Sequence, residues 1–108
     1  MIPEKVKIGG HQYTIFFPYL FRERDNLYGQ HDHAQKEIRI TGVDTCGAER
    51  AKSGIIVTFI HEVLHGIDFN SGHQIFNSEL GERALEGMAE GIYQVLIDNG
   101  WLTLQNKD

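Results

Sequence analysis

The sequence contains little cysteine and proline, and it has no long hydrophobic run. Cys46 is the only cysteine, so an internal disulfide is excluded and a reducing compartment is expected. The apolar stretch at residues 55–60 is too short to span a bilayer. Residues 1–5 lack the hydrophobic segment of a signal peptide. We therefore expect a cytoplasmic protein with neither a membrane span nor a secretory leader.

Positive charge is also scarce. Ten Lys and Arg residues against fifteen Asp and Glu residues give a net charge of −5, and the basic residues are scattered along the chain. Nucleic-acid surfaces concentrate basic residues, so this composition argues against one. The chain has 108 residues, of which 41% are hydrophobic, and we expect one globular domain over residues 1–108.

The N-terminal part of the sequence predicts β-structure. Residues 5–8 alternate polar with apolar, and residues 12–17 are aromatic and β-branched. Gly9 and Gly10 lie between these two stretches, which predicts a β-hairpin. Pro18 is expected to end the second strand.

The next stretch is less regular. Residues 19–28 favour no more than a short turn or half-helix, and residues 29–32 favour a turn. Residues 36–40 alternate like a half-buried strand, which Gly42 ends. The predicted fold class is therefore α+β, with a small antiparallel β-sheet of three to four strands covered on one face by helices.

The pentapeptide HEVLH at residues 61–65 is the strongest chemical signal in the chain. Residues four apart lie on one face of a helix, so His61 and His65 can bind one metal ion with Glu62 beside it as a base. Gly66 is expected to leave room next to that base. Apolar residues surround the motif at helical spacing: Ile55, Ile56, Phe59, Ile60, Val63, Leu64 and Ile67. The two histidines therefore border the core.

The helix that carries this motif is predicted from about Ala48 to Phe69. Asp44 or Thr45 can cap its N-terminus, and residues 70–72 (Asn-Ser-Gly) are expected to stop it.

A second helix is expected after Asn77 or Ser78, either of which can cap it, and it should stop at Gly100. Residues 101–102 are expected to fold back onto the core, and residues 105–108 are expected to fray.

A catalytic zinc site needs a third protein ligand and a water, and two histidines with one glutamate form an established set. The second helix carries four candidate carboxylates: Glu79, Glu82, Glu86 and Glu90. Glu79, in the first turn, is better explained as compensation of the helix dipole. Glu82 lies closest to the apolar stripe, whereas Ala89 and Tyr93 share a side of the helix with Glu86. The residues favour Glu86 and leave Glu82 open.

Two motifs together resemble a known class of protein. HEVLH, followed about twenty residues later by Glu86, Ala89 and Tyr93, is similar to the small gluzincin-type zinc metallopeptidases. The likeness is greatest to minimal phage-borne HExxH proteins and ImmA/IrrE-like peptidases, whose second motif is Glu-x-x-Ala followed by an aromatic residue. Residues 27–32 and 36–40 also resemble the strand region that precedes the motif helix in such phage proteins.

The resemblance implies a minimal zincin-like domain that binds one Zn²⁺ through His61, His65 and Glu86. It implies peptide-bond hydrolysis by a metal-activated water, with Glu62 as the catalytic base and a protein or peptide as the substrate. The expected setting is the cytoplasm of a bacterial or phage-infected cell. The alternative is a non-catalytic or latent zinc-binding regulatory module, although the retained Glu62 favours the enzyme. The sequence gives no signal for the oligomeric state.

Five other residues are candidates for a role in the site. Asp68 can either orient a ligand imidazole or be a solvated residue near the helix end. His31 and His33 could hold a second metal, but the same alternation is common in hairpins without one. His73 and Tyr93 could each donate a hydrogen bond to a developing oxyanion.

Overall fold

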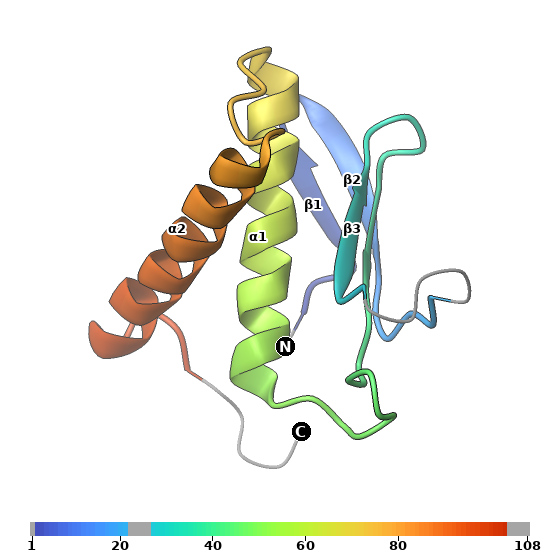
Figure 1. The fold of residues 1–108 in the computed structure, drawn as a ribbon, viewed down its shortest axis with the longest axis vertical. Coiled ribbons are helices and arrows are strands. Elements are labelled where there is room, and N and C mark those ends of the chain that lie inside the picture. Colours follow the sequence, from blue (N-terminus) through green and yellow to red (C-terminus); the bar gives the residue numbers. More distant parts are fainter. Residues whose placement is uncertain (1, 22–26, 104–108) are drawn as a thin grey trace.

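The structure is a computed structural model that describes residues 2–21 and 27–103 (Figure 1). A four-stranded sheet packs on one long helix, and a second long helix packs on the first. The strands are β1 (Lys5–Ile8), β2 (His11–Phe16), β3 (Gly29–Asp32) and β4 (Glu37–Ile40), and the helices are α1 (Lys52–Ser71) and α2 (Glu79–Asp98). The predicted α+β class is confirmed.

The sheet is mixed, so the predicted antiparallel arrangement is wrong for one pair of strands. The strand order is β1-β2-β4-β3, and β2 pairs with β4 in parallel while the other neighbours are antiparallel. After β2 the chain crosses to the edge of the sheet and forms β3. It then returns as β4, which lies between β2 and β3. The turn predicted at residues 29–32 is also wrong, because these residues form β3 and pair with β4.

The predicted hairpin of β1 and β2 is confirmed. Gly9 and Gly10 both have positive φ, at +59° and +83°, as a two-residue hairpin turn requires. Strand β2 ends at Phe16, shortly before Pro18. The expected turn or half-helix at residues 19–28 lies partly outside the described residues, since residues 22–26 are not described.

The core lies between the sheet and α1. Alternate residues of β2 and β4 point to this face, so Tyr13 and Ile15 pack with Ile38 and Ile40 against Ile55 of α1. Burying each such aliphatic side chain contributes about 1.5–3 kcal/mol. Among the described elements α2 contacts α1 alone, so α1 is the layer between the sheet and α2 (Figure 1).

Helix α1 begins at Lys52, four residues later than predicted. The backbone N–H groups of Cys46 and Ala48 donate to Asp44 Oδ1, each at 2.9 Å, so Asp44 organises a loop and caps no helix. Arg50 N also donates to Gly42 O at 2.9 Å and holds this loop to the end of β4. The predicted stop is confirmed, because Gly72 has a φ of +84° and its N–H donates to Phe69 O.

Helix α2 has the predicted ends. Ser78 Oγ accepts a hydrogen bond from Gly81 N at 2.9 Å, and Gly100 follows the C-cap with a φ of +72°. The expected packing of residues 101–102 is wrong for Trp101, which is 71% exposed. Residues 105–108 lie outside the described part of the chain.

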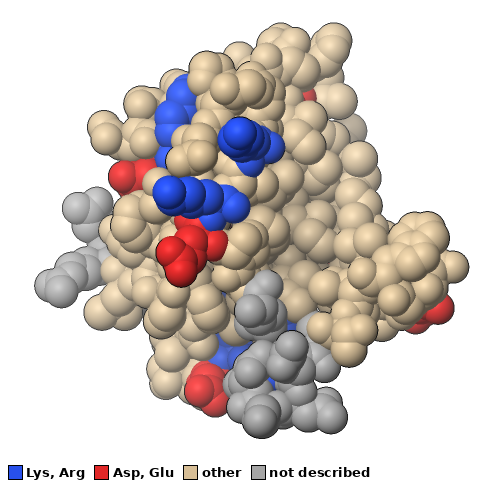
Figure 2. Space-filling view, turned by 180° about the vertical axis from the view of Figure 1, so that it is seen from behind, with Lys and Arg blue, Asp and Glu red and all other residues tan. Residues whose placement is uncertain are grey.

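The face seen from behind in Figure 2 carries Lys and Arg side chains close to Asp and Glu side chains and shows no wide area of one sign. Neither α1 nor α2 is apolar enough over its length to cross a membrane.

Candidate metal centre

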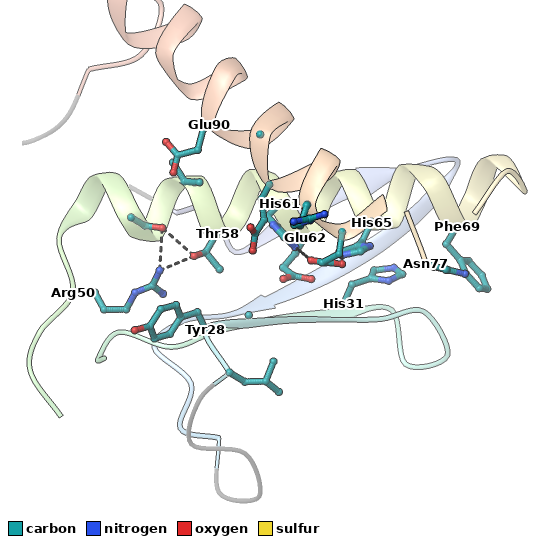
Figure 3. Close-up of a pocket in the computed structure, with 18 of the residues that line it drawn as sticks. Tyr28, His31, Arg50, Thr58, His61, Glu62, His65, Phe69, Asn77 and Glu90 are labelled. Atoms are coloured by element: carbon teal, nitrogen blue, oxygen red, sulfur yellow. Dashed lines mark hydrogen bonds and ion pairs between the residues drawn. The ribbon is translucent and has the colours of Figure 1, made fainter. Parts of the chain in front are cut away.

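A cleft of about 1160 Å³ lies along α1, between β3 on one side and α2 on the other. Helix α1 lines it with both motif histidines and Glu62, and β3 lines it from the sheet side with Gly29 and His31 (Figure 3). Helix α2 adds one row of carboxylates at four-residue spacing: Glu82, Glu86 and Glu90. The HEVLH motif is helical, as predicted, and its polar residues share one cleft.

Glu82 meets both motif histidines. His61 Nε2 lies 2.6 Å from Glu82 Oε1, and His65 Nε2 lies 3.0 Å from Glu82 Oε2. The two imidazole centroids are 5.0 Å apart, as expected for residues one helical turn apart. Each residue offers one potential ligand atom, and these atoms all lie within 4.8 Å of one another. This is the group in the described chain that could hold a metal ion.

Glu86, the ligand predicted from the sequence, lies one turn further along α2 and lines the same cleft. Its charge is close enough to favour protonation of His61, but the structure does not bring it into the group with both histidines. The structure brings Glu82 there instead. The sequence did hold a signal for Glu82, which lies nearest the apolar stripe that packs on α1. The identity of the third ligand stays a prediction that mutation can settle.

The three side chains have the chemistry of a zinc site. Zinc is bound by imidazole nitrogen and carboxylate oxygen at about 2.0–2.2 Å, which puts tetrahedral ligand atoms roughly 3.3 Å apart. The nitrogen–oxygen separations of 2.6 and 3.0 Å are hydrogen-bond distances within about 0.7 Å of that value. A small outward movement of the side chains would therefore admit an ion.

The surroundings favour the metal-binding form of His61. Burial lowers the pKa of His61, and the nearby charge of Glu82 opposes this effect only in part. The imidazole is therefore kept neutral over a wider pH range than an exposed histidine, and only a neutral imidazole binds a metal.

Glu62 is a buried carboxyl group, 6% exposed, beside the group of three. It projects from α1 toward the sheet (Figure 3). Burial, together with the smaller effect of the nearby charge of Glu82, raises the pKa of Glu62 to about 8. A carboxyl group with a pKa near neutrality is a typical acid–base catalyst.

Gly29 makes the space that Glu62 occupies, although the sequence predicted this role for Gly66. A Cβ added at Gly29 would lie 2.6 Å from Thr58 Cγ2 and 2.9 Å from Glu62 Oε2. A Cβ at Gly66 would instead meet Ile8 Cδ1 at 2.9 Å and the ring of His31 at 3.5 Å. The sequence pattern of residues 29–32 predicts a turn and therefore gives no role to Gly29, whereas a glycine inside a strand signals close backbone approach.

Gly29→Ala is therefore expected to destabilise the protein by about 1–3 kcal/mol, because a methyl group enters filled space. It should also displace Glu62. Chemical denaturation measures the stability, and Gly91→Ala is the control, since nothing lies within 4 Å of a Cβ at that exposed helical position. The control should stabilise the protein by up to about 1 kcal/mol. Equal stability of the two variants would show that β3 does not approach Glu62 this closely.

Asp68 has neither of the roles expected from the sequence. It is buried, and its two carboxylate oxygens accept hydrogen bonds from the backbone N–H groups of Ile75 (2.9 Å) and Phe76 (3.1 Å). Asp68 thus fixes the loop between the helices. A Cβ at Gly81 would lie 2.5 Å from Ile75 O, so the first turn of α2 is packed directly on this loop. Asp68 therefore helps to place Glu82.

Asp68→Ala should lower the free energy of unfolding by about 3 kcal/mol, because two hydrogen bonds to a buried charged group are lost. Zinc affinity should also fall, since the start of α2 loses its anchor. Asp98→Ala is the control at an exposed position, with an expected change within about 0.5 kcal/mol. Urea denaturation and zinc titration of both variants test this role, which an unchanged Asp68→Ala protein would contradict.

The remaining histidines and Tyr93 lie differently from the predicted candidates. Neither His73, which is exposed in the inter-helix loop, nor Tyr93 is among the described residues that line the cleft. His33 stacks on Phe69 with ring centroids 3.9 Å apart, and the described residues do not place it in a second metal group. His31 lines the cleft, and burial together with the charge of His65 lowers the pKa of His31 to about 4.

No family model matches the chain, and neither the curated proteins nor the solved structures gave a significant match. The motif and the geometry of the cleft are therefore the only indications of function. Together they define an α+β protein with a His–His–Glu group that could hold a metal ion.

Proposed function

We propose that the protein is a zinc-dependent peptidase that cleaves peptide bonds with a metal-activated water. The observation that carries the proposal is the convergence of His61, His65 and Glu82 in a cleft beside the buried Glu62. The resemblance of HEVLH and the following helix to small gluzincin-type metallopeptidases supports it.

In this proposal His61, His65 and Glu82 hold the ion, with Glu86 one turn away as the alternative third ligand. Bound zinc supplies a Lewis acid and lowers the pKa of a coordinated water toward about 7. Glu62 takes a proton from the attacking water and passes it to the leaving amine. A cation beside Glu62 favours its carboxylate form, so its pKa should fall below the metal-free value of about 8.

The substrate is proposed to be a protein or peptide in an extended conformation. Strand β3 is an edge of the sheet and borders the cleft, so its free backbone groups can pair with an added strand. The phage-type resemblance suggests a regulatory protein as the substrate. The net charge of −5 argues against a nucleic acid as a partner. We place the activity in a reducing cytoplasm because Cys46 is exposed and has no second cysteine to pair with.

A zinc-binding module without catalysis is the second candidate. A structural zinc site is closed by four protein ligands, whereas the described residues bring three groups together. A buried carboxyl group next to an open site has no use in a purely structural centre. These two features favour the enzyme over the binding module.

The test is to load the purified protein with zinc, measure the metal content, and incubate it with a broad peptide library. The proposal expects one zinc per chain and cleavage products that a zinc-loaded Glu62→Gln variant does not form. Full zinc loading with an unchanged library would favour the binding module. A protein that takes up no zinc would reject both candidates.

A further inference from the structure

A chain of hydrogen bonds runs from the core to the cleft. Asn70 Nδ2, near the end of α1, lies 3.0 Å from Tyr13 Oη, and Tyr13 Oη lies 3.1 Å from His31 Nε2. Tyr13 is fully buried, whereas His31 lines the cleft. These hydrogen bonds thus link the core of the sheet to a side chain that faces the proposed site. Neither the metal group nor the base uses these three residues.

The direction of the hydrogen bonds follows from the chemistry of the groups. The Asn70 amide NH₂ donates to Tyr13 Oη and also to Gly66 O, at 2.8 Å. Tyr13 must then place its own hydroxyl proton, and a buried donor without an acceptor is costly. Among residues 2–21 and 27–103, His31 Nε2 is the one acceptor within reach of this hydroxyl. We conclude that Nε2 of His31 carries no proton.

This conclusion fixes the tautomer of His31. A neutral imidazole with a bare Nε2 carries its proton on Nδ1, and that N–H is a hydrogen-bond donor. Within the described residues Nδ1 has no partner, and it is not sealed from solvent. The Cδ2–Nε2 edge of the ring lies against Gly66, so Nδ1 is on the opposite edge.

The ring is held firmly in place. His31 belongs to β3, where it pairs with Ile38 in the sheet register. The His31 ring contacts the Tyr13 ring, with centroids 5.3 Å apart. Asn70 packs closely on the hairpin turn, because a Cβ added at Gly9 would lie 2.8 Å from Asn70 Cβ. Figure 3 shows His31 on the sheet side of the cleft, across from His65 on α1. The donor is therefore fixed before any ligand binds.

We propose that His31 is a further catalytic residue of this site, which donates a hydrogen bond from Nδ1 to the carbonyl oxygen of the bound peptide. Tyr13 and Asn70 are positioning residues that set its tautomer. A fixed donor aimed at the oxygen where charge develops stabilises the transition state more than the bound substrate. This role rests on the proposed peptidase function. It requires no change in the metal ligands and no charge on the imidazole.

The tautomer is tested without any activity measurement. In protein labelled with ¹⁵N-histidine, long-range proton–nitrogen correlation spectra distinguish a protonated Nδ1 from a protonated Nε2. Wild-type His31 should show the proton on Nδ1. Tyr13→Phe removes only the hydroxyl group and should shift His31 toward the Nε2–H form, whereas His73→Ala should leave the His31 signals unchanged. A wild-type His31 protonated on Nε2, or charged at pH 7, would overturn the proposal.

The catalytic role is tested on the library peptide that zinc-loaded wild-type protein cleaves fastest. His31→Ala should lower kcat by about 100- to 1000-fold, with KM and zinc affinity within about threefold of wild type. His31→Gln keeps an N–H donor, so its kcat should be about tenfold higher than that of His31→Ala. Tyr13→Phe should lower kcat by about tenfold, through the tautomer alone. His73→Ala should match wild type.

The failures of the two proposals give different results. A His31→Ala variant with wild-type kcat, or one that loses zinc, would overturn the role of His31 and leave the peptidase proposal standing. A wild-type protein that binds zinc and cleaves no peptide would overturn both. In that case the spectra would still report whether Tyr13 and Asn70 fix the imidazole.

Discussion

Glu82→Ala is expected to lower the affinity for zinc by more than about 100-fold, because losing even an outer-shell partner of a metal ligand costs about 10- to 100-fold. The reason is geometric: Glu82 contacts both motif histidines, at 2.6 and 3.0 Å. Glu86→Ala is the matched control on the same helix face, one turn along, and should lower affinity by less than about tenfold. Competition with a chromophoric chelator measures both variants.

The comparison decides between the structure and the resemblance. If Glu86→Ala is the variant that loses zinc, α2 holds the ion one turn further along, as the sequence motif implies. If both variants lose zinc to the same extent, the two carboxylates share the ion. The site as the structure shows it is supported only if Glu82→Ala loses far more zinc affinity than Glu86→Ala.

Glu62→Gln is expected to lower kcat by about 10²- to 10⁴-fold while zinc affinity stays the same. Glutamine fills the same buried space but cannot take a proton from water. Glu62 contributes no ligand atom to the metal group, so its replacement should leave the ion in place. Steady-state kinetics and zinc titration on one preparation test this prediction. Wild-type kcat in Glu62→Gln would remove Glu62 as the base.

The same variant should change how the stability of the metal-free protein depends on pH. The pKa of Glu62 is raised from 4.5 to about 8 on folding, so between these values the unfolded chain is ionised and the folded chain holds a proton. Stability from this group is therefore present below pH 4.5 and is lost as pH rises toward 8. Glu62→Gln should flatten this decline, as measured by urea denaturation at several pH values. An equally steep decline would show that Glu62 is ionised in the fold.

Local signals in the sequence predicted three local features correctly: the hairpin, the cap of α2 and the end of α1. Two glycines between alternating strands gave the hairpin, Ser78 gave the cap of α2, and Gly72 gave the end of α1. The spacing of His61 and His65 placed two imidazoles together, because a helix of 3.6 residues per turn allows little else. Each of these features is determined by residues that lie close together in the sequence.

Features that depend on distant contacts were not predictable in the same way. The parallel pairing of β2 with β4 depends on the path of the chain between them, which periodicity does not encode. Which carboxylate of α2 lies against the motif histidines depends on where α2 crosses α1. Asp68 and Gly81 help to set that crossing through the inter-helix loop, and in the structure the carboxylate is Glu82. The close approach of Gly29 to Glu62 joins residues from two different layers.

X-ray absorption spectroscopy at the zinc edge, on protein loaded with one equivalent of zinc, tests the central claim most directly. We predict a first shell of two imidazole nitrogens and two oxygens, one from a glutamate and one from an exchangeable water, with Glu82→Ala removing the glutamate oxygen. A shell that contains sulfur from Cys46, or one closed entirely by protein side chains, would contradict the account.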